Sequence, residues 1–170
     1  MIKREFSRVK RQQADDLTDP YKTALEYKEL SVCRRCRSIY HDKRWSIDEK
    51  LYKSLLKDAG KVNYTLCPAC QKIQTGYVEG VVELEGDFLF KHKEDILNLI
   101  NNTEKRANYI DPLEKIIKID IDDQNEKIIL TTTSENLAQR IGKNLEKAYK
   151  GSVEYSFSKE DRMARVYWVR

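Results

Sequence analysis

The chain has 170 residues, of which 40% are hydrophobic, so it can bury the core of one ordinary domain or of two small ones. It has no run of 18 apolar residues and no apolar segment near its start, which predicts a cytoplasmic protein without a membrane span or a secretory signal. The net charge of +4 divides into +7 over residues 1–73 (17 basic less 10 acidic) and −3 over residues 74–170 (15 less 18). This asymmetry indicates that the first part binds a polyanion. The alternative is that its charged side chains only face solvent.

The first segment of the chain, residues 1–31, lacks a sustained apolar period. We expect it to form a basic arm without a core of its own, with one short helix over residues 20–29. Its five basic residues near the start are candidates for contacts with nucleic-acid phosphates: Lys3, Arg4, Arg8, Lys10 and Arg11.

Two C-x-x-C pairs follow, and they contain every cysteine of the chain: Cys33 with Cys36, and Cys67 with Cys70. Four thiolates favour zinc or iron in tetrahedral geometry, and a chain without an export signal keeps its thiols reduced, so we expect one structural Zn²⁺ rather than disulfides. A rubredoxin-like iron site is the main rival, although such sites carry Gly after each pair and this chain has Arg37 and Gln71. A redox dithiol is a further alternative.

The 30 residues between the two pairs are more than a simple four-cysteine pattern needs. After a strand and turn in SIYHDKRW, the spacing of Ser46 and Glu49 is typical of a capping box, and apolar residues at four-residue intervals predict a helix over 47–59. We expect this helix to pack on Tyr40 or Trp45. The sequence therefore predicts a zinc-ribbon module over residues 32–75 with an inserted helix.

Beyond the cysteines the pattern is an alternation of strands and helices. Its order, strand, helix, strand, strand, helix, strand, predicts a ferredoxin-like α/β sandwich over residues 76–170, in which two helices cover one face of an antiparallel sheet and an extra C-terminal strand is appended. The whole chain is thus expected to be α+β. The predicted strands are 77–85, 115–122, 127–133, 153–158 and 164–169, and the predicted helices are 87–108 and the segment between Ser134 and Gly151.

No arrangement of residues typical of catalysis is present in the sequence. His41 and His92 have no second ligand or nucleophile at a suitable spacing, and no Gly-rich phosphate loop occurs. The run Thr131–Ser134 is better explained as strand residues followed by a helix cap. Four cysteine ligands would also leave zinc no open position for a substrate. We therefore expect a protein that is not an enzyme and takes no small-molecule substrate.

The basic residues around the first pair of cysteines favour nucleic-acid binding. They are Arg34, Arg35, Arg37, Lys43 and Arg44. All five would contact phosphates. Alternatively, Arg34, Arg35 and Arg37, together with Lys72 after the second pair, would stabilise the thiolates of the metal site. Trp45 is expected to pack inside the module rather than to stack on a base. Aromatic residues in the last hairpin, among them Phe157 and Trp168, favour edge or core packing over contact with a protein partner.

Several segments resemble a family of uncharacterised bacterial four-cysteine zinc-ribbon proteins: CRRCRSIYHDKRW, CPACQKIQTGYVEGVVELEG, DPLEKI and TTTSENLAQRIGKNLEKAYKG. More distantly, the chain is similar to the large-ribosomal-subunit nuclear export adaptor family, whose members bind ribosomes but carry eight cysteines. The resemblance implies a zinc-binding factor that contacts ribosomal RNA or the ribosome in assembly, dormancy or stress. The alternative is a zinc-stapled adaptor that binds a protein partner through the C-terminal domain.

Overall fold

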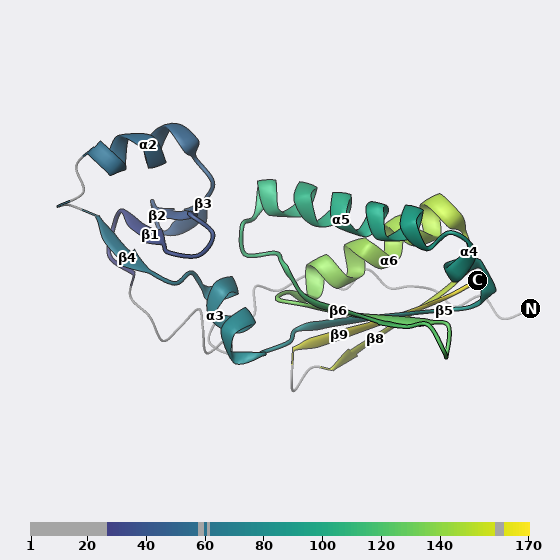
Figure 1. Ribbon diagram of the computed structural model, residues 1–170. Helices are drawn as coiled ribbons and strands as arrows, with labels where there is room; N and C mark the ends of the chain where they lie inside the picture. The colour runs from purple at the N-terminus through teal and green to yellow at the C-terminus, as the bar shows by residue number, and fades with distance from the viewer. Residues whose placement is uncertain (1–26, 58–59, 61, 159–161) are drawn as a thin grey trace, which may run out of the picture.

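The computed structural model describes residues 27–57, 60, 62–158 and 162–170, and these residues form a mixed α+β protein with two sheets. A small sheet near the start of the chain lies beside the cysteines, and a larger sheet carries two long helices on one face (Figure 1). None of the helices in the described part of the chain has the length and apolar character needed to cross a membrane. The predicted arm residues Lys3, Arg4, Arg8, Lys10 and Arg11 lie outside the described residues.

The smaller sheet consists of short strands in the order β3-β2-β1-β4. Its strands are β1 (Ser31–Cys33), β2 (Ile39–His41), β3 (Arg44–Ser46) and β4 (Asn63–Thr65). The turn between β2 and β3 places Asp42 and Lys43 in the left-handed region, with φ of 51° and 60°, which matches the twist of a tight hairpin. Strand β4 pairs parallel to β1 and brings the chain back to the first cysteine pair.

The inserted helix is present as α2 (Glu49–Lys57), but both its cap and its packing differ from the prediction. Asp48 caps the helix, because its Oδ1 accepts from the amides of Lys50 and Leu51, both at 2.9 Å. Leu55 packs on Val32 and Ile39. The expected contact with Tyr40 or Trp45 is wrong, because those two rings pack beside the cysteines instead.

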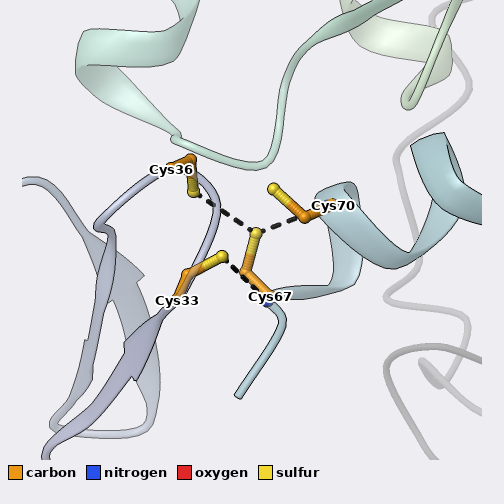
Figure 2. Close-up of side chains that lie close together, drawn as sticks. All are labelled: Cys33, Cys36, Cys67 and Cys70. Atoms are coloured by element: carbon orange, nitrogen blue, oxygen red, sulfur yellow. Dashed lines mark hydrogen bonds between the residues drawn. The ribbon is translucent and has the colours of Figure 1, made fainter. Parts of the chain in front are cut away.

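The second cysteine pair does not lie in a free-standing turn. It lies at the start of a helix, α3 (Pro68–Thr75), which the sequence analysis did not predict (Figure 2). Cys67 is the N-cap residue, Pro68 occupies the first turn, and Gly76 ends the helix in the left-handed conformation at φ 70°. Proline just inside the start and glycine just past the end are the usual boundaries of a helix, so this pattern could have revealed α3.

The larger sheet has five strands in the order β6-β7-β5-β9-β8. They are β5 (Gly80–Glu85), β6 (Ile116–Asp122), β7 (Lys127–Thr132), β8 (Ser152–Ser158) and β9 (Met163–Val169). The sheet is mixed and not antiparallel as predicted, because β9 pairs parallel to β5. The last strand is therefore inserted between β5 and β8, where the prediction had it appended.

The position of β9 follows from its side chains. Ala164, Val166 and Trp168 point to the helical face and are all buried. On β8, Val153 and Tyr155 point the same way but are only partly buried. Because the strand that buries more apolar surface gains more from a central position, β9 lies inside the sheet and β8 at its edge.

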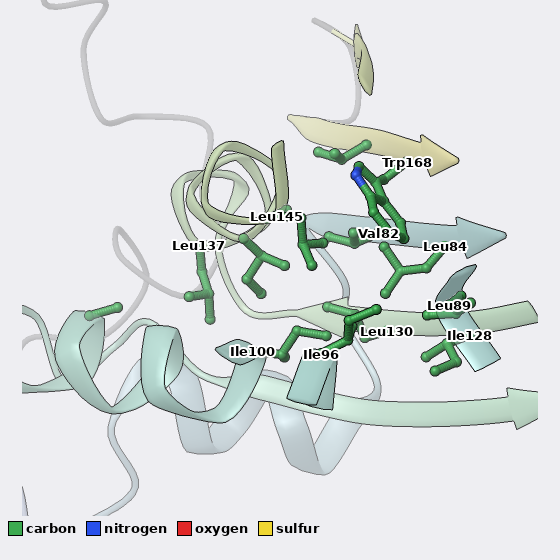
Figure 3. Close-up of a cluster of buried hydrophobic side chains, with 14 residues drawn as sticks. Val82, Leu84, Leu89, Ile96, Ile100, Ile128, Leu130, Leu137, Leu145 and Trp168 are labelled. Carbon is green, nitrogen blue, oxygen red and sulfur yellow. The ribbon is translucent and has the colours of Figure 1, made fainter. Parts of the chain in front are cut away.

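Three helices accompany this sheet: α4 (Asp87–Lys91), α5 (Lys93–Ile110) and α6 (Glu135–Tyr149). The predicted helix over 87–108 is broken at His92, whose φ of −122° separates α4 from α5. The predicted cap of α6 is confirmed, since Ser134 Oγ accepts from the amide of Leu137 at 3.2 Å. Helices α5 and α6 cover one face of the sheet and enclose an apolar core (Figures 1 and 3). Its largest fully buried side chain is Trp168.

Candidate metal centre

The four cysteines meet at one point. One ligand atom from each lies within 4.8 Å of all the others, and Sγ of Cys36 is 3.6 Å from Sγ of Cys67 (Figure 2). A disulfide would need about 2.05 Å between sulfurs, and the four thiols are free. A tetrahedron of thiolates at a metal–sulfur distance of about 2.3 Å has edges of about 3.8 Å. The sulfurs are therefore already spaced as a single tetrahedral ion requires.

Local backbone geometry positions the first pair. Cys33 ends β1, and the chain turns back through Cys36 so that the amide of Arg37 donates to the carbonyl of Cys33 at 2.9 Å. The amide of Cys33 in turn donates to the carbonyl of Ser38 at 2.8 Å. To close this turn Arg37 adopts φ 63°, the conformation that glycine occupies at little cost. Arg37 thus holds a backbone conformation that glycine would adopt at lower cost.

The second pair is positioned by helix α3. The amide of Cys70 donates to Sγ of Cys67 at 3.4 Å, and the amide of Cys67 donates to Sγ of Cys33 at 3.3 Å. Backbone amides directed at sulfur stabilise the thiolate form, and so does the positive end of the helix dipole.

The four thiols cannot all ionise by themselves. Hydrogen bonds from Cys36, and then from Cys67 and Cys70, hold the pKa of the Cys33 thiol far below its usual value. The same crowding acts in the opposite direction on Cys70, whose pKa is strongly raised by Cys33, Cys36 and Cys67. A divalent cation among the sulfurs would remove this conflict, because each ligand would face positive charge. Sulfur donors suit zinc and iron, and the geometry accommodates either.

An apolar shell surrounds the sulfurs. Trp45 is 8% exposed and packs with Cys33, Cys67 and Cys70. It is therefore buried in the module as expected, but against the cysteines and not against the inserted helix. The ring of Tyr27 meets that of Trp45 edge-on at 5.0 Å. Leu113, from the loop between α5 and β6, packs against the same cluster. Water is excluded from most of the site, and Cys36 is the one ligand of the four that is only half-buried.

The candidate phosphate-contacting residues that the structure describes are all exposed, but they fall into two groups. Arg34, Arg35 and Arg37 surround the first cysteine turn. Lys43 and Arg44 lie at the far end of β2, and the three residues of that strand separate the groups by about 10 Å. The second group also adjoins Asp42 and the contact between His41 and Glu29. The concentrated positive charge is therefore that of the first group.

Lys72 does not serve the sulfurs or an outside anion, as its place after the second pair suggested. It is 4% exposed, and its Nζ lies 2.6 Å from Oε1 of Glu79 and 3.4 Å from the carbonyl of Thr133. Lys72 therefore fastens α3 to the larger sheet. Glu79 directly precedes the central strand β5 and alternates with its half-buried Glu83 and Glu85, and the Glu79 carboxylate is largely covered by the contact with Lys72.

Two tyrosines near the first arginine group were missed by the sequence analysis. Nη2 of Arg34 donates to the carbonyl of Tyr64 at 3.2 Å, and the ring of Tyr64 is 43% exposed on β4. The guanidinium of Arg37 lies over the ring of Tyr52, 5.9 Å from its centroid. Strand β4 has only three residues and no periodicity, so its exposed aromatic ring left no pattern in the sequence.

The two histidines lie apart from the cysteines. His41 contacts Glu29, which raises the pKa of the imidazole, and a weaker Coulomb attraction to Asp42 acts in the same sense. These three groups are close enough to hold an ion. All of them lie at the surface, and the contacts of His41 with Glu29 and Asp42 explain why they lie close together. His92 stands at the junction of α4 and α5, where its ring lies 4.2 Å from that of Phe88.

We compared the chain with known proteins in three ways. No protein-family model matches the sequence, and neither the curated proteins nor the solved structures contain a match.

Proposed function

We propose that Cys33, Cys36, Cys67 and Cys70 bind one structural Zn²⁺, and that residues 76–170 form a ferredoxin-like domain with a fifth strand inserted. Support for zinc comes from the convergence of four free sulfurs at tetrahedral spacing inside an apolar shell. Bound zinc would offset half of the negative charge of the four thiolates and would join the first hairpin to the start of α3. With four protein ligands it would have no open position, so its role would be structural and the protein would not be an enzyme.

We further propose that the zinc module binds ribosomal RNA, in the cytoplasm, in assembly, dormancy or stress of the ribosome. The observation that carries this proposal is the placement of Arg34, Arg35 and Arg37 on the turn that holds two of the metal ligands. The exposed ring of Tyr64 beside Arg34 adds a surface on which an unpaired base could stack. The metal would therefore hold a cationic surface with an adjacent aromatic platform in shape. The choice of ribosomal RNA rests on the family resemblance alone.

The metal is tested on purified protein by elemental analysis. We expect about one zinc per chain, lost in Cys67→Ser together with the signals of residues 31–75 in a heteronuclear NMR spectrum. Strong visible absorption with bound iron would instead identify the rubredoxin-like alternative. A metal-free protein with an unchanged spectrum would refute the metal site altogether.

RNA binding is tested by sedimentation of the tagged protein with ribosomal subunits and by titration with ribosomal RNA fragments. The triple variant R34Q/R35Q/R37Q should weaken binding and reduce the slope of log K against log salt by about 2, since each phosphate contact in a single strand contributes about 0.7. The matched control is K105Q/K143Q/K147Q, which removes the same charge from exposed helical positions of the other domain. Equal losses in both variants would mean that only net charge matters, and unchanged binding would refute the proposed surface.

A protein-binding adaptor is the second candidate. It is favoured by the end of α5, where Tyr109 is 82% exposed and Ile110 is 76% exposed on neighbouring positions. Such a pair of large apolar side chains is typical of a contact surface. Pull-down after nuclease treatment separates the two functions, because a protein contact survives the treatment and one bridged by RNA does not. The variant Y109S/I110S should abolish capture only in the adaptor case.

A further inference from the structure

The two edges of the five-stranded sheet are protected to different degrees. Strand β6 has an irregularity between Ile116 and Lys118, and three charged residues, Lys118, Asp120 and Asp122, alternate along it. Bulges and charges of this kind prevent a second strand from pairing at an edge. Strand β8 has neither protection. It pairs with β9 in unbroken register over seven residues and carries one charged residue, Glu154.

The helical side of β8 is also incompletely covered. Val153, Tyr155 and Phe157 alternate along the strand and point to the side on which α6 lies. Helix α6 packs chiefly on β9 and β5, so β8 extends beyond it. As a result Phe157 is 54% exposed, while Val153 and Tyr155 are only partly buried. Among the strands that the structure describes, none pairs with the outer side of β8, and this edge also carries an apolar strip.

We propose that β8 pairs antiparallel with β8 of a second copy of this chain, in a register centred on Tyr155. In that register the strand SVEYSFS is self-complementary in polarity. Val153 of each copy lies opposite Phe157 of the other copy. Each exposed Phe157 ring is thus covered by a valine, once on each side of the two-fold axis. The two Tyr155 residues lie opposite each other at the axis itself, while each ring stays packed on α6 of its own copy. On the open face Glu154 lies opposite Ser156, so no like charges oppose each other.

Charge favours this register as well. Within one copy, Ser156 pairs with Arg165 on β9. Across the axis, Glu154 would therefore lie opposite the small Ser156 of the second copy, with Arg165 on the next strand beyond it. The long side chains of Glu154 and Arg165 could then reach each other over the serine. Glu154 and Arg165 are both exposed, and neither forms an ion pair with another described residue. The dimer thus gives Glu154 and Arg165 a partner of opposite charge that no described residue of the same copy supplies.

The resulting dimer has one continuous sheet made from two five-stranded sheets, with the α5 and α6 helices of both copies on the same face. Because α6 lies over β9 and β5, the two α6 helices stay apart and the six apolar side chains of the two β8 strands fill the space between them. A closed two-fold arrangement pairs the β8 edge of one copy with the β8 edge of the other, so no β8 edge remains for a further copy and the dimer cannot extend into a fibre. The protected β6 edges end the sheet at each side.

The test is the molar mass of the full chain, measured by light scattering and sedimentation equilibrium over a range of concentrations. We expect the mass to rise from 20.1 kDa toward twice that value. Ser156→Glu places a second carboxylate opposite Glu154, twice in each dimer, and it should yield monomer at all concentrations. The introduced carboxylate can pair with Arg165 within its own copy, so this variant is not expected to unfold. Ser156→Lys places a cation opposite Glu154 and should retain the dimer.

The matched control is Lys118→Glu, a charge change on the opposite edge strand, which should leave the mass unchanged. Circular dichroism confirms that each variant is folded. A wild-type chain that stays monomeric at millimolar concentration overturns the proposal, and so does a dimer that persists in Ser156→Glu. A dimer lost in Lys118→Glu would place the interface at the other edge and would overturn it equally.

Discussion

The ammonium group of Lys72 lies 2.6 Å from the carboxylate of Glu79, with side chains that are 5% and 12% exposed. Lys72 is on the helix that carries two of the cysteines, and Glu79 precedes the central strand β5. This ion pair therefore lies at the junction between the cysteine module and the larger sheet. A charge pair so far removed from water is costly to break on one side, because the partner is left buried without compensation.

Lys72→Met should accordingly lower the free energy of unfolding by about 3–5 kcal/mol, the usual loss when one member of a buried pair is removed. Chemical denaturation followed by fluorescence measures the change. Lys53→Met is the matched control, because the pair of Lys53 with Glu49 is exposed and should be worth at most about 0.5 kcal/mol. Equal losses in the two variants would show that the buried pair has no special weight.

Glu114 makes stability depend on pH. Burial raises the pKa of its carboxyl, an effect that Arg140 opposes at 3.4 Å and Asp111 reinforces. The folded protein thus holds this proton more tightly than the unfolded chain does, so the group favours folding at acid pH and opposes it as pH rises through the folded pKa. Glu114→Gln, which stays neutral, should melt above wild type at pH 7.

This advantage should vanish below pH 4.5, the ordinary pKa of the group, because wild type is then protonated as well. Thermal melts at both pH values provide the measurement. Glu146→Gln changes an exposed residue of α6 and should show no such difference. A variant that is less stable than wild type at pH 7 would mean that the contact with Arg140 outweighs the cost of burial.

Gly142 on α6 faces β9 and β8 at a close approach. A Cβ at this position would lie 2.5 Å from Cγ1 of Val166, which is itself buried, and 3.2 Å from Oη of Tyr155. Overpacking of this kind costs about 1–3 kcal/mol, of which the better helix propensity of alanine returns at most about 1 kcal/mol. Gly142→Ala should therefore lower the urea midpoint, whereas Lys143→Ala, one residue along, should not.

Substitution of Arg37 tests the effect of charge on RNA binding separately from the effect on stability. Its left-handed backbone costs about 1 kcal/mol, and the contact with Tyr52 returns about half of that. Arg37→Gly should therefore stabilise the protein slightly while it weakens RNA binding. Arg35→Gly removes the same charge from a position that is not left-handed, and it should be destabilising. Thermal melts and RNA titrations of both variants test the contrast, which fails if the two melts move in the same direction.

Local rules predicted the C-terminal elements well because those elements are long. Alternation over β5 and the four-residue spacing of Leu137, Ile141 and Leu145 each span enough residues to define a face. The cap at Ser134 and the left-handed Gly151 then bound α6. The convergence of the four cysteines was likewise readable from their spacing, because that ligand chemistry is specific.

The remaining elements depend on contacts that are remote in sequence. Strands β1 and β4 have three residues each and show no period, and β4 pairs only with the remote β1, which also pairs with β2. The exchange of β8 and β9 was equally hidden, because both strands alternate and only the burial of Trp168 in the assembled core decides which lies inside. The same holds for Lys72, whose partner Glu79 is determined by how α3 meets the sheet.

The contact of Leu113 shows that the cysteine module packs against the rest of the chain. A leucine that belongs to the connection between α5 and β6 fills part of the hydrophobic wall around the sulfurs. A peptide cut after Gly76 would retain every ligand and yet leave that wall open to solvent, which would expose the coordinated sulfurs to chelators and oxidants. With the proposed zinc bound, metal exchange in the intact chain should for this reason respond to the length and sequence of a loop more than 40 residues downstream of Cys70.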